Sequence, residues 1–266
     1  MATRHWRMVQ TLALAGLVFA LPGWARRPET GFLNRVVTVG GVAYNYQVFV
    51  PRQWSKNQKW PVILFLHGHG ESGQDGLMQT GEGIGNAIRL GVERFPFLVV
   101  FPQCRKGDWW TSDAMERQAL QALDLTVKEF KGDPERIYLT GLSMGGFGTW
   151  DMGAKYAGRF AALVPICGGV RLGHHVAGAP DVPDSRDLYT TAAQKIGKTP
   201  VWAFHGGADH TVPVTQSREL VEALKAAGGN VRFTEYPGVG HNSWDKAYAE
   251  PDLLPWLLSQ KLSAAK

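Results

Sequence analysis

Cysteine is scarce in this chain: Cys104 and Cys167 are the only two among 266 residues. An even number still permits one disulfide if the protein is exported. Clustered basic residues are also missing, because the densest basic spots are pairs such as Arg26-Arg27. A nucleic-acid-binding protein would show a basic stripe, so we expect no nucleic-acid partner despite the formal net charge of +5. Internal repeats, low-complexity tracts and convincing linkers are absent as well.

Long apolar runs are missing except near the N-terminus. Arg4 and Arg7 supply a positive start, the run from Thr11 to Leu21 is almost wholly apolar, and small residues follow it. This pattern is typical of a secretory signal peptide, and the run is too short for an ordinary membrane span. We therefore expect residues 1–25 to be a cleaved signal peptide and residues 26–266 to form a single domain. The mature protein would be exported, periplasmic or extracellular, without a membrane span; an uncleaved anchor is the alternative.

The hydrophobic pattern predicts strands that alternate with helices. Residues 32–39 and 42–50 flank the turn Gly40-Gly41, which indicates an antiparallel hairpin. The other expected strands cover 61–66, 97–101, 136–140, 161–166, 201–204 and 231–236, and the expected helices cover 82–91, 113–130, 146–156, 214–227 and 245–262. Apolar runs spaced by helices predict an α/β fold, a mostly parallel, doubly wound sheet of about eight strands with helices on both faces. Residues 168–199 are the one long irregular stretch.

The most informative segment surrounds Ser143. A β-branched and aromatic run ends at Thr140, the pentapeptide Gly141-Leu142-Ser143-Met144-Gly145 follows directly, and helix-tolerant residues lead away. A serine at the apex of such an elbow adopts a strained backbone, so its neighbours two residues away must be nearly free of side chains. The alternative is a glycine-rich turn with an incidental serine. The strand before the turn favours a nucleophile elbow.

Two further residues follow strand ends later in the chain. Asp209 lies just past the strand at 201–204, and His241 lies just past the strand at 231–236. Chemistry in open α/β sheets gathers at the carboxyl ends of strands. A serine hydroxyl needs an imidazole to take its proton and a carboxylate to orient that imidazole. Alone, Asp209 could cap a helix and His241 could be a surface residue; with Ser143 they predict a catalytic triad.

An oxyanion formed at Ser143 would need two backbone N–H donors. One should be Met144, which directly follows the serine, and the other should come from residues 67–71, after the strand at 61–66. His67 and His69 have the spacing of a metal-binding pair, but a third and fourth ligand are not evident. We therefore expect neither a metal nor a cofactor.

Three tryptophans are candidate substrate contacts. Trp109 and Trp110 follow the strand at 97–101, and Trp244 lies three residues past His241. Both positions should border the cleft, where indoles could stack on an aromatic, sugar or apolar acyl group. The alternative is that they simply pack the loops.

These motifs make the chain resemble the α/β-hydrolase superfamily. Within it the chain resembles bacterial secreted esterases grouped with feruloyl-esterase-like, polyhydroxybutyrate-depolymerase-like and prolyl-oligopeptidase-like hydrolases. The matching segments are 66–73, 101–103, 141–146, 165–169, 205–209 and 240–241. The resemblance implies the α/β-hydrolase sheet, carries the triad onto Ser143, Asp209 and His241, and assigns the second oxyanion amide to His69. It leaves the substrate open, because such motifs serve many acyl-transfer reactions.

The strand order implied by this resemblance bears on the cysteines. It places two strands between those that lead to Cys104 and Cys167, so three strand spacings give a separation of roughly 14 Å. A disulfide needs Cα atoms within about 7 Å. We therefore expect both thiols to be free unless the loops carry them together.

These inferences favour a secreted serine carboxylesterase that acts through an acyl-enzyme. Its substrate would be a short acyl ester, a feruloyl or acetyl ester on polysaccharide, or a polyester. A serine peptidase of prolyl-oligopeptidase type is the first alternative, although such relatives usually add a large N-terminal propeller. A non-catalytic hydrolase-fold binding protein is the second, but it would normally have lost a triad residue. The oligomeric state is not determined by the sequence.

Overall fold

The computed structural model describes residues 29–170 and 187–262. The expected signal peptide at residues 1–25 lies outside these ranges. Within them, none of the helices is both long and apolar enough to cross a membrane. Both cysteines are buried, free thiols, and the sheet does place two strands between those that precede them.

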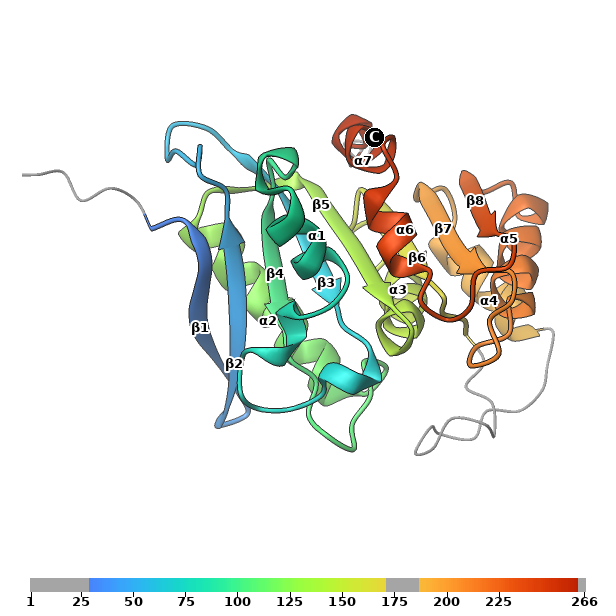
Figure 1. Ribbon diagram of the computed structural model, residues 1–266, viewed down its shortest axis with the longest axis horizontal. Coiled ribbons are helices and arrows are strands. Elements are labelled where there is room, and N and C mark those ends of the chain that lie inside the picture. The colour runs from blue at the N-terminus through green and yellow to red at the C-terminus, as the bar shows by residue number, and fades with distance from the viewer. Residues whose placement is uncertain (1–28, 171–186, 263–266) are drawn as a thin grey trace, which may run out of the picture.

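A single eight-stranded sheet, in the order β1-β2-β4-β3-β5-β6-β7-β8, organises the molecule (Figure 1). The strands are β1 (Gly31–Val39), β2 (Val42–Val50), β3 (Trp60–Leu66), β4 (Leu98–Pro102), β5 (Gly132–Leu142), β6 (Ala162–Ile166), β7 (Val201–Gly206) and β8 (Val231–Tyr236). β1 and β2 form the expected antiparallel hairpin, β2 pairs antiparallel with β4, and the remaining pairs are parallel. The predicted fold class is therefore confirmed.

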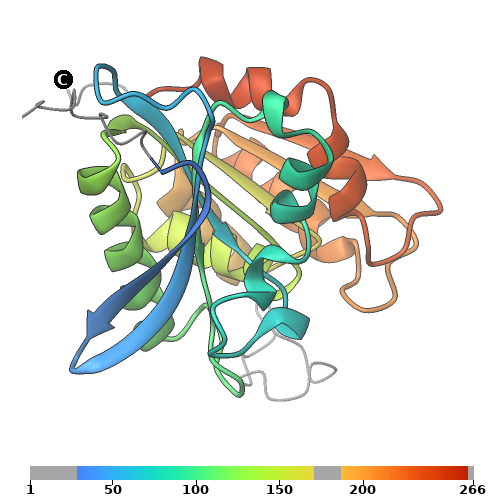
Figure 2. The same ribbon diagram turned by 60° about the vertical axis from the view of Figure 1, so that its left-hand side comes forward.

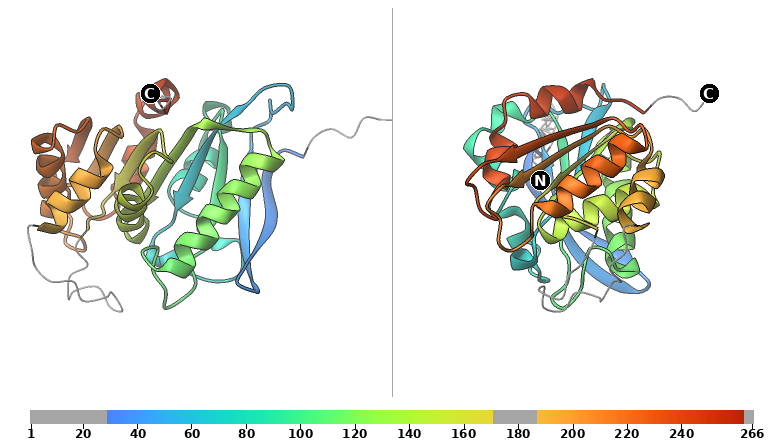
Figure 3. Two further views of the ribbon diagram at one scale, coloured as in Figure 1. Left: turned by 180° about the vertical axis from the view of Figure 1, so that it is seen from behind. Right: turned by 90° about the vertical axis from the view of Figure 1, so that its right-hand side faces the viewer.

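Helices cover both faces of the sheet, which Figures 2 and 3 show from the side and from the end. One face carries α2 (Asp113–Glu129), α3 (Met144–Lys155), α4 (Asp187–Ile196) and α5 (Thr215–Ala226), and the other carries α1 (Ile84–Leu90), α6 (Trp244–Ala249) and α7 (Leu253–Ser259). Short 3-10 turns, η1 (His69–Glu71), η2 (Met78–Thr80) and η3 (Val92–Arg94), complete the connections. The doubly wound arrangement predicted from the apolar runs is thus present.

The period of two along each strand divides the core. In β3, Leu64 and Leu66 face the helices α2 to α5, whereas Ile63 and Phe65 face α1, α6 and α7. All four are fully buried. A strand with helices on both sides must be apolar at every position, which explains the uninterrupted run in the sequence. The two cores hold the sheet rigidly, so the loops at its carboxyl edge start from fixed points.

The structure differs from the sequence-based prediction at two segments. The expected helix over 245–262 is two helices, because Pro251 lacks an amide hydrogen and disfavours a helical Glu250 before it. The stretch 168–199, expected to be irregular, contains α4 at its end. Tyr189 and Ala193 of that helix are buried in the core, so packing on the sheet stabilises it. The rest of the predicted loop, residues 171–186, lies outside the described residues.

Candidate active site

Ser143 occupies the sharp turn between β5 and α3 with φ 52° and ψ −117°. A positive φ is strained for a non-glycine residue, as the elbow prediction requires. Close contact explains the flanking glycines: a Cβ at Gly145 would lie 1.9 Å from the Leu66 carbonyl oxygen, and one at Gly141 would lie 2.3 Å from the Gly145 carbonyl oxygen. The amide of Ser143 donates to the Ile166 carbonyl at 3.0 Å, which ties the turn to β6.

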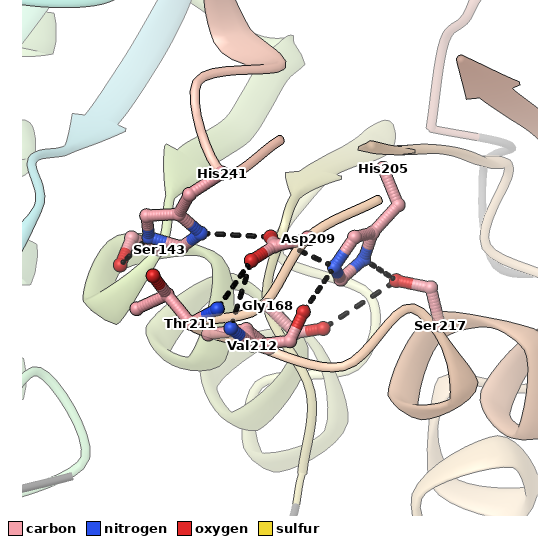
Figure 4. Close-up of polar contacts among 8 residues, drawn as sticks. All are labelled: Ser143, Gly168, His205, Asp209, Thr211, Val212, Ser217 and His241. Carbon is pink, nitrogen blue, oxygen red and sulfur yellow. Dashed lines mark hydrogen bonds and ion pairs between the residues drawn. The ribbon is translucent and has the colours of Figure 1, made fainter. Parts of the chain in front are cut away.

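The three residues expected to act together do meet at the carboxyl edge of the sheet. The His241 Nε2 lies 2.9 Å from the Ser143 Oγ, and its Nδ1 lies 2.7 Å from the Asp209 Oδ2 (Figure 4). They come from the ends of β5, β7 and β8, although 98 residues separate the serine from the histidine. The Asp209 side chain is fully buried, whereas that of His241 is 22% exposed. A reactant can therefore approach the hydroxyl and imidazole but not the carboxylate.

The surroundings of Asp209 fix the protonation pattern of this chain of hydrogen bonds. Burial opposes ionisation, but hydrogen bonds from His205, His241 and the Val212 amide outweigh it and hold the pKa of the Asp209 carboxyl well below its usual value. The carboxylate therefore accepts the Nδ1 hydrogen of His241. The His241 Nε2 therefore carries no hydrogen and accepts the hydroxyl hydrogen of Ser143.

The backbone amides of Met144 and His69 are the two oxyanion donors that the sequence predicts. Met144 begins α3 directly after the serine, and His69 begins η1 directly after Gly68. In the described part of the chain, neither amide donates a hydrogen bond to another protein group. Free backbone donors at a helix start attract negative charge. Both remain candidates for oxyanion stabilisation.

His67 is a structural residue beneath this loop. Its Nδ1 lies 2.6 Å from the Gly68 carbonyl oxygen, and its Nε2 accepts the Cys104 amide at 2.9 Å. The Trp110 indole donates to the His67 carbonyl at 2.9 Å. Both ring nitrogens are therefore engaged by the protein, and the side chain is fully buried. His69, by contrast, is exposed, so the two residues do not form the metal-binding pair that their spacing suggested.

His67 makes stability depend on pH. Burial lowers its pKa from 6.5 to about 4, so between these values the unfolded chain binds a proton that the folded chain does not. Stability from this residue is complete above pH 6.5 and decreases as the pH falls to about 4, by at most about 3 kcal/mol. Urea unfolding of the wild type and of His67→Gln at pH 7.5 and 4.5 measures it. The variant should lose less stability on acidification than the wild type; equal losses would contradict the assignment.

The three tryptophans have different environments. Trp110 is fully buried and its indole anchors the loop through His67, which favours the alternative that it packs a loop. Trp109 is 6% exposed and packs edge-on against Phe147. Trp244 is partly exposed, and its ring centroid lies 5.6 Å from that of His241 in a T-shaped contact. It is the indole best placed to meet a substrate.

Some residues around the site were missed by the sequence reasoning. Glu82 accepts the Trp244 indole hydrogen at 3.3 Å. Ser217 is the third residue of α5 and lies 2.7 Å from a ring nitrogen of His205. The Cys167 sulfur lies in a group with Asp209 and His241 whose ligand atoms are all within 4.8 Å of one another. Burial raises the pKa of the Cys167 thiol to about 12, so it stays protonated. The spacing of these residues along the sequence does not predict which of them come into contact.

The sheet order, the elbow and the hydrogen-bonded serine, histidine and aspartate define an α/β-hydrolase fold. The chain belongs to the dienelactone hydrolase family, whose model matches residues 104–250.

The chain is also similar to several curated relatives and solved structures. The chain is 27% identical to "Poly(3-hydroxyalkanoate) depolymerase C" of Paucimonas lemoignei, over 86% of this chain and 58% of that protein. It therefore spans little more than half the length of that relative. Other curated relatives include a probable carboxylesterase and peptidases. A structure described as a thermostable esterase matches with a TM-score of 0.73 and 30% identity, covering 86% of this chain and 63% of that one. The feruloyl esterase module of Clostridium thermocellum, complexed with sinapinate, matches with a TM-score of 0.65 and 18% identity, covering 88% and 90%.

Proposed function

We propose that this protein is a serine carboxylesterase that hydrolyses carboxylic esters through an acyl-enzyme. The observation that carries the proposal is the chain of hydrogen bonds in which His241 bridges Ser143 at 2.9 Å and Asp209 at 2.7 Å. This geometry needs little rearrangement for proton transfer from the hydroxyl to the imidazole. The esterase and depolymerase relatives support the choice of ester substrates.

The proposed reaction has two halves. The Ser143 Oγ attacks the ester carbonyl carbon while His241 Nε2 takes the hydroxyl proton, and the Asp209 carboxylate stabilises the resulting imidazolium. The amides of His69 and Met144 receive the negative charge on the carbonyl oxygen. The tetrahedral intermediate expels the alcohol, which takes the proton from His241. Water, deprotonated by His241, then attacks the acyl-enzyme, and the released Ser143 oxygen recovers that proton.

The partly exposed Trp244 is the proposed substrate contact, and Trp109 contributes less because it is nearly buried. The proposed substrates are esters with an acyl or aryl group that an indole can contact. They are a short acyl ester, a feruloyl or acetyl polysaccharide ester, or a polyester. Export is part of the proposal and rests on residues 1–25, with a relative named as an uncharacterized secreted protein in support.

A fluorophosphonate probe with peptide mass spectrometry tests the proposed nucleophile. We expect a single adduct at Ser143, formed more slowly when p-nitrophenyl acetate competes. The same preparation should hydrolyse p-nitrophenyl esters and leave the matching p-nitroanilides intact. Labelling with amide cleavage instead would favour the peptidase alternative, and no labelling would favour a binding protein. Methyl ferulate and a polyester film, tested beside the simple esters, would narrow the substrate class.

Trp244 offers a test of the substrate contact. Trp244→Ala should raise KM for methyl ferulate about fivefold, since an aromatic contact is worth about 1 kcal/mol beyond its buried area. For p-nitrophenyl acetate the acyl group is too small to reach it, so the acetyl-transfer rate should change less. Glu82→Gln is the matched control, because it keeps an acceptor for the indole. Equal effects on both substrates would contradict a contact with the acyl group.

A further inference from the structure

A second histidine lies on the far side of Asp209 (Figure 4). The Asp209 Oδ1 accepts the amides of Thr211 at 2.8 Å and Val212 at 2.9 Å. Its Oδ2 receives His241 Nδ1 at 2.7 Å and lies 3.3 Å from His205 Nε2. The aspartate is therefore held from four directions, and His205 shares the oxygen that His241 uses.

The partners of His205 fix the direction of its hydrogen bonds. Its Nε2 faces two acceptors, the Asp209 carboxylate and the Val212 carbonyl oxygen at 2.9 Å, so this nitrogen must carry a hydrogen. Its Nδ1 lies 2.7 Å from the Ser217 Oγ, which also lies 3.4 Å from the Gly168 carbonyl oxygen. If Nδ1 is bare, the hydroxyl donates to it; if Nδ1 is protonated, the hydroxyl turns to Gly168. Either way the Nε2 hydrogen is donated to the Val212 carbonyl oxygen, and the Asp209 carboxylate lies 3.3 Å from the same nitrogen.

The position of His205 in the sheet explains what its contact with Asp209 holds in place. His205 lies within β7, paired with Glu235 of β8, and its side chain is fully buried. Asp209 lies on the loop that leaves the strand through Gly206 and Gly207. His205 contacts this loop at two points, Asp209 and Val212. Its side chain thereby adds to the backbone hydrogen bonds that hold this loop, from the Gly207 amide to the Tyr236 carbonyl and from the Ala208 amide to the Val239 carbonyl.

We propose that His205 is a positioning residue that holds the Asp209 carboxylate in line with His241, and that Ser217 in turn holds the His205 ring. The inference rests on the proposed esterase function, because its readout is the efficiency of that triad. His205 touches neither the substrate nor the reacting atoms, so its effect must pass through Asp209. The expectation is a loss in kcat rather than in substrate binding.

The other titratable groups around the pair are few in the described part of the structure. Cys167 lies beside Asp209 and His241, and Glu235 lies close enough to interact electrostatically with His205. Arg218 pairs with Glu235 at 2.6 Å and balances its charge. No described cation other than a histidine touches the Asp209 carboxylate, so the two imidazoles and the two amides are the polar groups that surround it.

A double-mutant cycle with p-nitrophenyl acetate tests the inference. His205→Leu should lower kcat about 10- to 100-fold with KM within about twofold, since hydrogen bonds to charged groups contribute about 1.5–3 kcal/mol. His205→Gln, which keeps an N–H near the Nε2 position, should retain most of the activity. In an Asp209→Asn background, His205→Leu should cost no more than about twofold further, because residues that act in series are not additive. Equal losses in both backgrounds, or a loss confined to KM, would overturn the proposal.

Two further variants keep the test decisive if His205→Leu folds poorly. Ser217→Ala leaves His205 in place and removes its hydroxyl partner, so kcat should fall by a smaller factor, and that loss should also vanish in Asp209→Asn. Tyr138→Phe is the stability control: it removes one partly buried hydrogen bond, from the middle of β5 to the Gln260 carbonyl at 3.1 Å. It should lower Tm without changing kcat. If Ser217→Ala is fully active, the inference is wrong.

The same data separate failure of the inference from failure of the esterase assignment. If replacing Ser143 with alanine leaves hydrolysis intact, the proposed function itself is wrong. If that replacement abolishes hydrolysis while His205→Leu is harmless, only the positioning role is wrong.

Discussion

Ser143→Ala is expected to lower kcat for p-nitrophenyl acetate by at least about 10⁴-fold, because the attacking atom is removed and water must react unaided. The fold should survive. The hydroxyl has one hydrogen bond in the described structure, to the partly exposed His241, so the free energy of unfolding should change by less than about 1 kcal/mol. Initial rates and urea unfolding measure the two quantities. Ser259→Ala, which alters an exposed serine of α7, is the control and should behave as the wild type.

A second substitution at position 143 measures the backbone strain. Glycine tolerates the φ of 52° that alanine and serine adopt only at a cost. Ser143→Gly should therefore be inactive yet more stable than Ser143→Ala by about 1 kcal/mol, after allowance for the greater entropy of glycine in the unfolded chain. A less stable glycine variant would mean that the turn stores little strain. Full activity in Ser143→Ala would contradict the assignment of Ser143 as the nucleophile.

Gly145→Ala is expected to lower stability by at least about 3 kcal/mol, since overpacking against backbone leaves no flexible neighbour to move. Its Cβ would lie 1.9 Å from the Leu66 carbonyl oxygen and 2.8 Å from that of His67. The start of α3 would have to separate from the end of β3, which displaces the amides of Met144 and His69 from each other. Activity should fall with stability. The urea midpoint and kcat of the purified variant are the measurements.

Gly70→Ala is the matched control for the glycine experiment. Gly70 also lies at the carboxyl edge of the sheet, but an added Cβ would meet no atom within 4 Å, and its φ is not in the left-handed region. Its urea midpoint should stay close to that of the wild type. If Gly145→Ala were as stable as Gly70→Ala, close backbone contact would not be the reason for glycine in the elbow.

The sequence predicted the fold well because burial on both faces of the sheet leaves a direct trace in residue type. Continuous apolar runs such as Val62 to Leu66 have few other uses than a central strand. Helix boundaries were harder to predict where a proline interrupts a helix, or where a helix forms by packing against residues far away in the sequence. Pro251 divided the last helix, and α4 formed in a stretch without a clear pattern because Ala193 finds a core to pack against.

The site was predictable to the extent that each residue follows a strand. Ser143, Asp209 and His241 were found from their positions after three strands, since parallel strands end at one edge. The environment of each side chain was not predictable. Trp109 and Trp110 are neighbours with the same residue type, yet Trp110 is a fully enclosed anchor and Trp109 borders His69, with ring centroids 6.1 Å apart.

The sequence by itself therefore determined the sheet, the elbow and the order of the three residues that meet at its edge. These features depend on local residue type and on the period of burial along the chain, which the sequence records directly. The tertiary structure alone decided that His67 is buried and bonded at both nitrogens, and that His205 and Ser217 stand behind Asp209. Such contacts arise when segments far apart in sequence pack together, and hydrogen-bond partners are chosen by that packing rather than by residue type.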